Sequence, residues 1–140
     1  MGYKFIDHTA DIAVEIRAHS LPELFQFATG ALLECLVNPR KVHTAEKRTI
    51  HFTADSYEEA LVTFLSELNY LLTVKKWVFA HIDNICMETE DSKIKFSAIV
   101  SGENLTAEHE LKVEIKAITY HQMNIQFENE YFTTRIIFDI

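Results

Sequence analysis

Glycine and proline are scarce in this sequence of 140 residues, which has three glycines and two prolines. Loops that cradle nucleotide phosphates need several glycines at fixed spacing, and neither a GxGxxG nor a Walker-type loop is present. The GxSxG and HExxH patterns of common hydrolases are missing as well. The sequence therefore does not resemble the nucleotide-binding proteins and hydrolases that these patterns identify.

Cysteine is equally rare, with only Cys35 and Cys86, which lie in apolar periodic segments. They lack CxxC spacing and a nearby histidine, which disfavours a zinc site. A disulfide between them is possible but not needed, and we expect two core thiols in a reducing compartment. No run of about 18 apolar residues and no signal-peptide pattern occurs. The sequence therefore predicts a cytoplasmic protein without a membrane span.

Positive charge is in deficit, because 13 lysines and arginines face 21 aspartates and glutamates and the net charge is −8. Affinity for nucleic acid depends largely on lysine and arginine displacing counterions. We therefore expect no direct nucleic-acid binding. A cation, a basic protein surface or a small molecule is the partner class that this charge favours.

Two strand–helix units open the chain. Residues 12–18 alternate between apolar and polar, and Ser20 with Glu23 forms a capping box before an amphipathic helix. Residues 48–54 predict a second strand, and Ser56 with Glu59 caps a second helix. The two units superimpose at an offset of 36 residues, which fits either a duplicated unit or two ordinary strand–cap–helix units.

Everything after the second helix predicts β-structure, and residues 102–110 are expected to form a mobile loop. The expected strands cover residues 77–88, 93–101, 111–119, 123–128 and 131–139. The pattern predicts one α+β domain over residues 1–140. In it, two helices pack on one face of a mostly antiparallel sheet in two layers.

Chemically versatile side chains gather at the ends of the predicted strands. Asp7, His8 and Asp11 precede the first long strand, and Asp139 and Ile140 close the last one. Lys116, Thr119, Tyr120 and His121 fall at another strand end, and Glu67 and Asn69 are expected at the edge of the second helix's apolar face.

Asp11 fits two interpretations. It is a turn-former, as aspartates before strands commonly are, or it is a ligand for a hard cation together with Asp139. The second interpretation requires the first and last long strands to be adjacent and antiparallel, so that the start of one meets the end of the other. A terminal carboxylate or the main-chain oxygen of Ile140 would add a further oxygen donor.

An ordered set of motifs resembles the archease family. The set comprises "DHTADIAVEIRAHSLPELFQFATGALLE", "LVTFLSELNYLL", "EIKAITYHQMNIQ" and the closing "IIFDI". The resemblance runs from Tyr3 to Ile140 and covers nearly the whole chain. Each motif alone is weak, whereas the four in this order are specific.

The resemblance implies a non-enzymatic helper of the RtcB-type RNA ligase, which uses GTP and manganese in tRNA splicing and RNA repair. It implies that the helper promotes ligase guanylylation and multiple turnover, with GTP bound only by the ligase. By matching motif, Asp11, Asp139 and Ile140 would hold a divalent cation: calcium in a crystal, or manganese or magnesium in a cell. Lys116 matches a functionally important lysine, and His8 and His121 are supporting residues.

Two other functions compete with this one. A stand-alone metal-dependent hydrolase would use Asp11 and Asp139 to hold the ion and His8 or His121 as the general base. A chaperone or a modulator of another RNA-modifying enzyme would use the acidic, hairpin-rich surface instead. Two carboxylates without a further histidine or glutamate cluster are a sparse set for catalysis.

Overall fold

The computed structural model describes residues 1–6, 11–120 and 123–140. These residues form two helices and two antiparallel sheets, here called sheet A and sheet B. The main elements are β1 (Gly2–Ile6), β2 (Asp11–Ala18), α1 (Leu21–Leu36), β3 (Glu46–Ala54), α2 (Tyr57–Thr73), β4 (Trp77–Glu90), β5 (Lys93–Asn104), β6 (Ala117–Thr119), β7 (Gln126–Glu128) and β8 (Tyr131–Asp139). Two 3₁₀ turns, at Pro39–Lys41 and Ala107–His109, complete the order.

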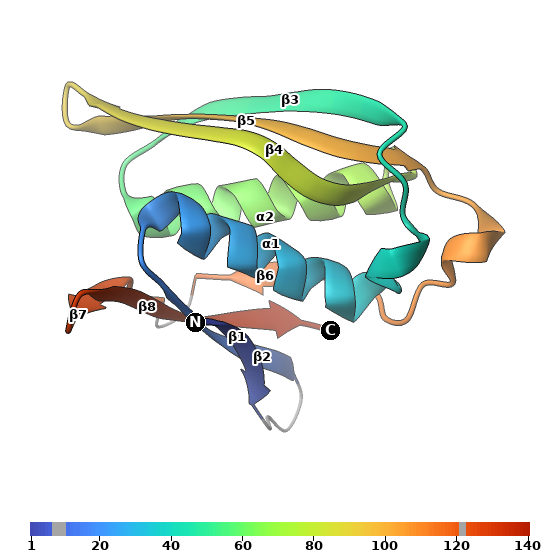
Figure 1. The fold of residues 1–140 in the computed structure, drawn as a ribbon, viewed down its shortest axis with the longest axis horizontal. Helices are drawn as coiled ribbons and strands as arrows, with labels where there is room; N and C mark the ends of the chain where they lie inside the picture. Colours follow the sequence, from blue (N-terminus) through green and yellow to red (C-terminus); the bar gives the residue numbers. More distant parts are fainter. Residues whose placement is uncertain (7–10, 121–122) are drawn as a thin grey trace.

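Both helices lie between the two sheets (Figure 1). Sheet A has the order β1-β2-β8-β6, with β7 pairing β8, and sheet B has the order β3-β5-β4. The α+β class with two helices and antiparallel strands is confirmed. The expected single sheet with two layers is wrong in its layering, because the strands divide between two sheets that cover opposite sides of the helices.

Both serines cap their helices as the sequence predicts, whereas the glutamates bond one residue earlier than in the predicted capping box. The Ser20 hydroxyl accepts a hydrogen bond from the Glu23 N–H at 3.2 Å, and the Ser56 hydroxyl accepts one from the Glu59 N–H at 3.0 Å. Each glutamate carboxylate in turn accepts the N–H of the residue before the serine, His19 in the first case. The serine contacts satisfy N–H groups that a helix start leaves without intrahelical partners, and the glutamate contacts hold the residue just before each cap.

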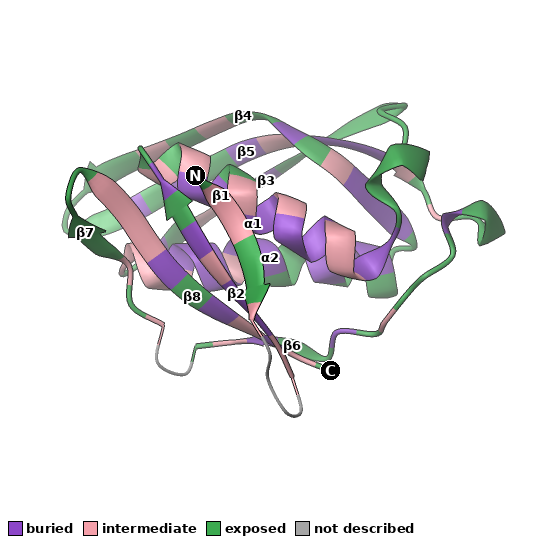
Figure 2. Cartoon of the chain, turned by 60° about the horizontal axis from the view of Figure 1, so that its bottom comes forward, coloured by how far each residue is buried: buried purple, intermediate pink, exposed green. Residues whose placement is uncertain are grey.

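The core fills the space on both sides of the helices. Phe25, Phe64 and Phe96 pack together from α1, α2 and β5, and the buried Ile136 and Phe138 of β8 belong to the same cluster. Burial alternates along β8 (Figure 2), and it alternates along β2 from Val14 onward. One face of each strand therefore packs on the helices, and the other forms the outer surface of the molecule.

The segment expected as a strand over residues 111–119 is a strand only at its end, in β6. Before β6 the backbone bonds to the helices: the Lys112 N–H donates to the Leu36 carbonyl at 2.8 Å, and the Asn69 amide donates to the Ile115 carbonyl at 2.8 Å. Asn69 is thus buried, not at the edge of the apolar face as expected. Its side chain holds the segment that precedes β6 against α2.

Two further expectations need correction. Residues 102–104 belong to β5, not to a loop, and His109 fixes the turn that follows by contacting Glu103 at 2.9 Å. Cys86 is exposed, and Cys35 is half-buried, so the two free thiols are not both in the core. Among the described residues, no helix combines the length and the apolar character needed to cross a membrane.

Candidate functional site

The pairing of β2 with β8 determines the site. These antiparallel strands place Asp11 directly opposite Asp139. The cation interpretation of Asp11 requires the first and last long strands to be adjacent and antiparallel, and this condition is met. Directly opposed residues have Cβ atoms about 4.5–5.5 Å apart and share one face of the sheet.

That shared face is the outer face of sheet A. Val14 and Phe138 of the two strands are fully buried against the helices, and side chains alternate between faces along a strand. Asp11 and Asp139 are each one residue out of phase with the core positions, and both are half-buried. The two aspartates, with Ile140 following, are called the acidic tip below.

The short strand β6 brings Lys116 to the tip. Ala117 lies opposite Asp139 on the other side of β8, and the Lys116 N–H donates to the Asp139 carbonyl at 2.7 Å. Lys116 is exposed. Three segments that are far apart in the sequence therefore meet at one end of sheet A.

His8 and His121, the supporting residues of the predicted site, lie outside the described residues, as does Asp7. Within the described part of the chain, no group of three or more histidines, cysteines, aspartates or glutamates is placed to hold a metal ion. The tip offers two carboxylates and main-chain oxygens, which are donors that hard cations use. The cation-binding role of Asp11, Asp139 and Ile140 stays a prediction.

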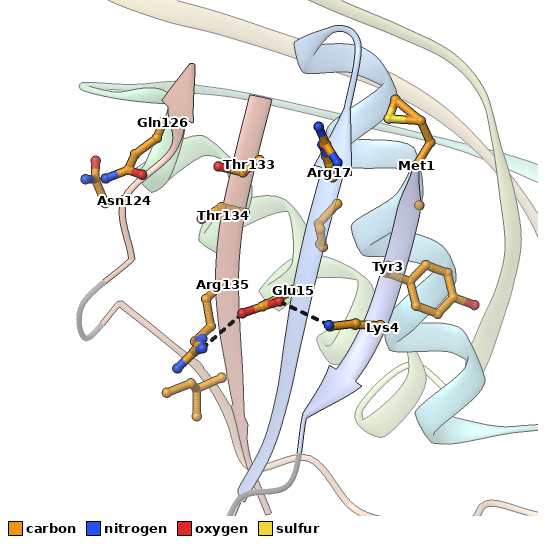
Figure 3. A pocket seen from close by; sticks show the side chains of 13 residues that line it. Met1, Tyr3, Lys4, Glu15, Arg17, Asn124, Gln126, Thr133, Thr134 and Arg135 are labelled. Atoms are coloured by element: carbon orange, nitrogen blue, oxygen red, sulfur yellow. Dashed lines mark hydrogen bonds and ion pairs between the residues drawn. The ribbon is translucent and has the colours of Figure 1, made fainter. Parts of the chain in front are cut away.

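An open groove of about 850 Å³ occupies the same outer face, farther along the strands (Figure 3). Glu15 of β2 stands at its centre and forms an ion pair with Arg135 of β8 at 3.0 Å and another with Lys4 of β1 at 3.9 Å. The guanidinium of Arg17 lies 3.8 Å from the ring centre of Tyr131. The lining has three cationic side chains, of Lys4, Arg17 and Arg135, and one carboxylate. The groove is therefore locally positive, although the chain as a whole has a net charge of −8.

A tyrosine anchors the wall of this groove. The Tyr3 hydroxyl donates to the Glu34 carboxylate of α1 at 2.5 Å. Burial, followed by this hydrogen bond, raises the pKa of Tyr3 to about 12, so the phenol keeps its proton at physiological pH. The bond ties β1 to α1 and holds one side of the groove in place.

The chain matches the model of the Archease protein family (MTH1598/TM1083) over residues 3–140. The chain belongs to the archease family. Curated relatives named "Protein archease" include one from Methanosarcina acetivorans, which is 31% identical over 99% of this chain and 95% of its own length. Another, from Pyrococcus abyssi, is 35% identical over 89% of this chain and 87% of its own length.

Solved archease structures have the same fold. The solution structure of protein 1598 from Methanobacterium thermoautotrophicum matches with a TM-score of 0.84 at 27% identity, covering 99% of both chains. The crystal structure of a Thermotoga maritima archease matches with a TM-score of 0.61 at 26% identity, covering 98% of this chain and 96% of that one, and is described as a possible chaperone. The resemblance inferred from the sequence motifs is therefore confirmed.

Sequence reasoning did not find the groove. The alternation over residues 12–18 predicts a polar face for this strand, but nothing in the sequence pairs Glu15 with Arg135, 120 positions later. The alternating charges of the two strands are the only signal, and using it requires the register of the sheet.

Proposed function

We propose that this archease is an accessory protein of an RtcB-type RNA ligase and that it works through a cation held at the acidic tip. It promotes guanylylation of the ligase and multiple turnover in tRNA splicing and RNA repair. The observation that supports this most is the direct opposition of Asp11 and Asp139 beside Lys116, in a chain that belongs to the archease family. Catalysis on RNA stays with the ligase.

The donor set fits a hard divalent cation. Carboxylates on directly opposed residues are close enough to share one ion, since cation–oxygen bonds are about 2.0–2.6 Å long and side chains can converge on it. An oxygen of Ile140, the next residue after Asp139, adds a donor at the same strand end. Calcium, manganese and magnesium all accept such ligands, and water would complete the coordination.

The charge of the protein supports binding to a basic cleft of the ligase. With a net charge of −8, the protein would be attracted to a cationic RNA-binding surface, and complementary charge speeds encounter. The acidic tip places two carboxylates opposite each other at one end of sheet A, so this end is the part that enters. GTP and RNA bind the ligase, and the cytoplasm is the expected compartment.

The residues of the tip have distinct tasks in this mechanism. Asp11 and Asp139 would hold the cation, which would supply positive charge near the phosphates of the ligase active site. Lys116, fixed to Asp139 through its backbone, contacts a phosphate or an acidic group of the ligase. The helper thereby favours the state in which the ligase can be guanylylated again.

The test is multiple-turnover RNA ligation with limiting ligase. Asp11→Ala and Asp139→Ala should remain folded and lose both stimulation and cation binding measured by calorimetry. Lys116→Ala should lose stimulation while it retains the cation. Glu88→Ala, which removes an exposed carboxylate from sheet B, is the matched control and should behave as the wild type.

Two outcomes would contradict the proposal. Normal stimulation by both aspartate variants would refute the role of the tip. Hydrolysis of a phosphoester by the purified protein, lost in Asp11→Ala, would instead favour a metal-dependent hydrolase. Pull-down of a dominant partner other than an RNA ligase would favour a more general chaperone or modulator.

A further inference from the structure

A row of hydrogen-bond donors crosses the groove on the outer face of sheet A. Arg17 of β2 lies directly opposite Thr133 of β8, and Thr133 lies directly opposite Gln126 of β7. All three side chains line the groove (Figure 3), and directly opposed residues share one face of a sheet with Cβ atoms about 4.5–5.5 Å apart. A guanidinium, a hydroxyl and a carboxamide therefore stand side by side on three strands.

These donors are not engaged within the protein. Among the described residues, no hydrogen bond or ion pair to another protein group involves the side chains of Arg17, Thr133 or Gln126. The guanidinium of Arg17 lies over the ring of Tyr131, 3.8 Å from its centre. Contact with a ring face fixes the plane of a guanidinium and leaves the N–H groups at its edge free to donate. Arg17 is therefore a preorganised cation without a carboxylate partner in the part of the chain that the structure describes.

The charged side chains of the groove leave an excess of two positive charges. Among the described lining residues, Glu15 carries the one carboxylate, and Lys4 and Arg135 share it at 3.9 and 3.0 Å. One of these two cations is therefore not neutralised, and Arg17 adds a second positive charge. The N–H groups of arginine match the oxygens of a phosphate in pairs. A phosphate monoester has a charge of about −1.5 to −2 at pH 7, which matches this excess.

Carboxylates outside the lining are bonded elsewhere or lie apart from it. Glu34 of α1 accepts a hydrogen bond from the Tyr3 hydroxyl, and Glu58 of α2 accepts one from the Ile125 N–H. Glu128 is exposed at the end of β7 and is not part of the lining. The acidic tip is four residues away along β2, about 13 Å, and surface charges are largely screened beyond about 8 Å at physiological salt. The groove therefore keeps its local positive charge.

We propose that this groove binds a phosphate monoester. Arg17 donates to the phosphate oxygens, Thr133 and Gln126 complete the row of donors, and Lys4 and Arg135 supply charge from the adjoining cross-strand row. Two sources present this group: a small phosphorylated metabolite and the phosphorylated end of a nucleic-acid strand. The net charge of −8 disfavours a long polyanion, so the small molecule is the favoured source. The site depends neither on the proposed ligase role nor on a cation at the acidic tip.

Titration of the intact protein by two-dimensional NMR tests the site, in a buffer with EDTA so that no cation at the acidic tip bridges to the phosphate. The probes are ribose 5-phosphate, a uridine pentanucleotide with a terminal phosphate and the same pentanucleotide without it. Ribose 5-phosphate should shift the amide signals of residues 15–17 and 133–135, and ribose should not. Binding of the phosphorylated pentanucleotide at least about tenfold more tightly than ribose 5-phosphate would assign the phosphate to a strand end, and equal or weaker binding would assign it to a small molecule.

Arg17→Gln should weaken the binding of the phosphate at least about tenfold, because charge-assisted hydrogen bonds are lost. Arg48→Gln is the matched control and should bind as the wild type does. Arg48 is also exposed and also lies over a ring, 4.9 Å from the ring centre of Trp77, but it is outside this groove. Glu15→Gln removes the lining carboxylate and should tighten binding at least about threefold, whereas Glu88→Gln on sheet B should not change it.

Four results would overturn the proposal. The first is that neither phosphorylated probe binds, and the second is that the shifts are confined to segments outside the groove. The third is an equal loss of affinity in Arg17→Gln and Arg48→Gln, or no gain in Glu15→Gln. The fourth is binding of the unphosphorylated pentanucleotide as tight as that of the phosphorylated probes, because the groove would then recognise any phosphodiester.

Discussion

Replacing Asn69 by aspartate tests how α2 supports the tip. Asn69 is 8% exposed, and its side-chain nitrogen donates to the Ile115 carbonyl at 2.8 Å. The next residue, Lys116, donates its N–H to Asp139 at 2.7 Å. The other amide atom of Asn69, its oxygen, is buried without a hydrogen-bond partner among the described residues. Aspartate keeps the shape of the side chain but puts an oxygen where the donor nitrogen lies.

The expected magnitude follows from these contacts. Loss of the donor leaves the Ile115 carbonyl unpaired, which costs about 1–3 kcal/mol. At neutral pH the new carboxylate is also buried without a compensating charge, and an unpaired buried charge costs about 3–5 kcal/mol in all. Asn69→Leu loses the same donor but also removes the unpartnered oxygen, so it should cost only about 1 kcal/mol. The difference in unfolding free energy between the two variants therefore measures the cost of the buried charge.

Urea unfolding followed by the fluorescence of the single tryptophan measures both variants. Burial raises the pKa of the introduced carboxyl in the folded state. The penalty is therefore complete above that raised pKa, shrinks as pH falls, and is gone below the unfolded value of about 3.9. Once protonated, the introduced carboxyl can again donate a hydrogen bond to the Ile115 carbonyl. Hydrogen exchange at the Lys116 amide should accelerate in the aspartate variant at neutral pH.

Equal stability of the two Asn69 variants at neutral pH would refute the reasoning, because it would show that the buried carboxylate at this position carries no penalty beyond the lost donor. A deficit in the aspartate variant that does not shrink on acidification would do the same.

The remaining predictions concern two glycines and one carboxylate. A Cβ on Gly102 would lie 2.2 Å from the Val78 carbonyl oxygen, so Gly102→Ala should destabilise by at least about 3 kcal/mol in urea unfolding. Gly30→Ala on α1 meets its nearest atom at 3.5 Å and should stabilise by about 0.5–1 kcal/mol; the opposite order would contradict this steric account. The hydrogen bond from His109 lowers the pKa of Glu103, so its contribution is present above the unfolded pKa of about 4.3 and is lost as pH falls through the folded pKa. Glu103→Gln should therefore lose less unfolding free energy than the wild type between about pH 6 and about pH 3, and an identical loss would exclude this source.

Local patterns predicted the elements well where a single strand or helix decides the outcome. The alternation from residue 131 onward predicted β8 with the bounds that the structure has, Tyr131–Asp139. Ser20 and Ser56 cap their helices as expected. Caps and alternation are local, and their geometry depends little on distant residues.

The arrangement of sheets could not be read from the same patterns, because alternation shows that a strand buries one face but not which sheet it joins. The wide buried face of α1 indicates that sheets lie on both sides of it. Its buried residues include Ala28, Thr29, Ala31, Leu32 and Leu33, which form a wider face than a helix on one sheet needs. A helix buried on two sides requires a layer on each side, and sheets A and B supply these layers.

The candidate site likewise depends on the register between strands, which the sequence does not give. Two cross-strand pairs on β2 and β8 differ sharply in charge. Four residues along β2 and β8 from the tip, Glu15 lies opposite Arg135, with Lys4 on its other side, as the preference for opposite charges across strands predicts. At the tip, the same two strands place Asp11 opposite Asp139, which is the unfavourable combination. Sites where a chain departs from a local rule that it follows nearby are where function is expected. The cross-strand register, not the presence of acidic residues, therefore makes the tip the best candidate for a cation site.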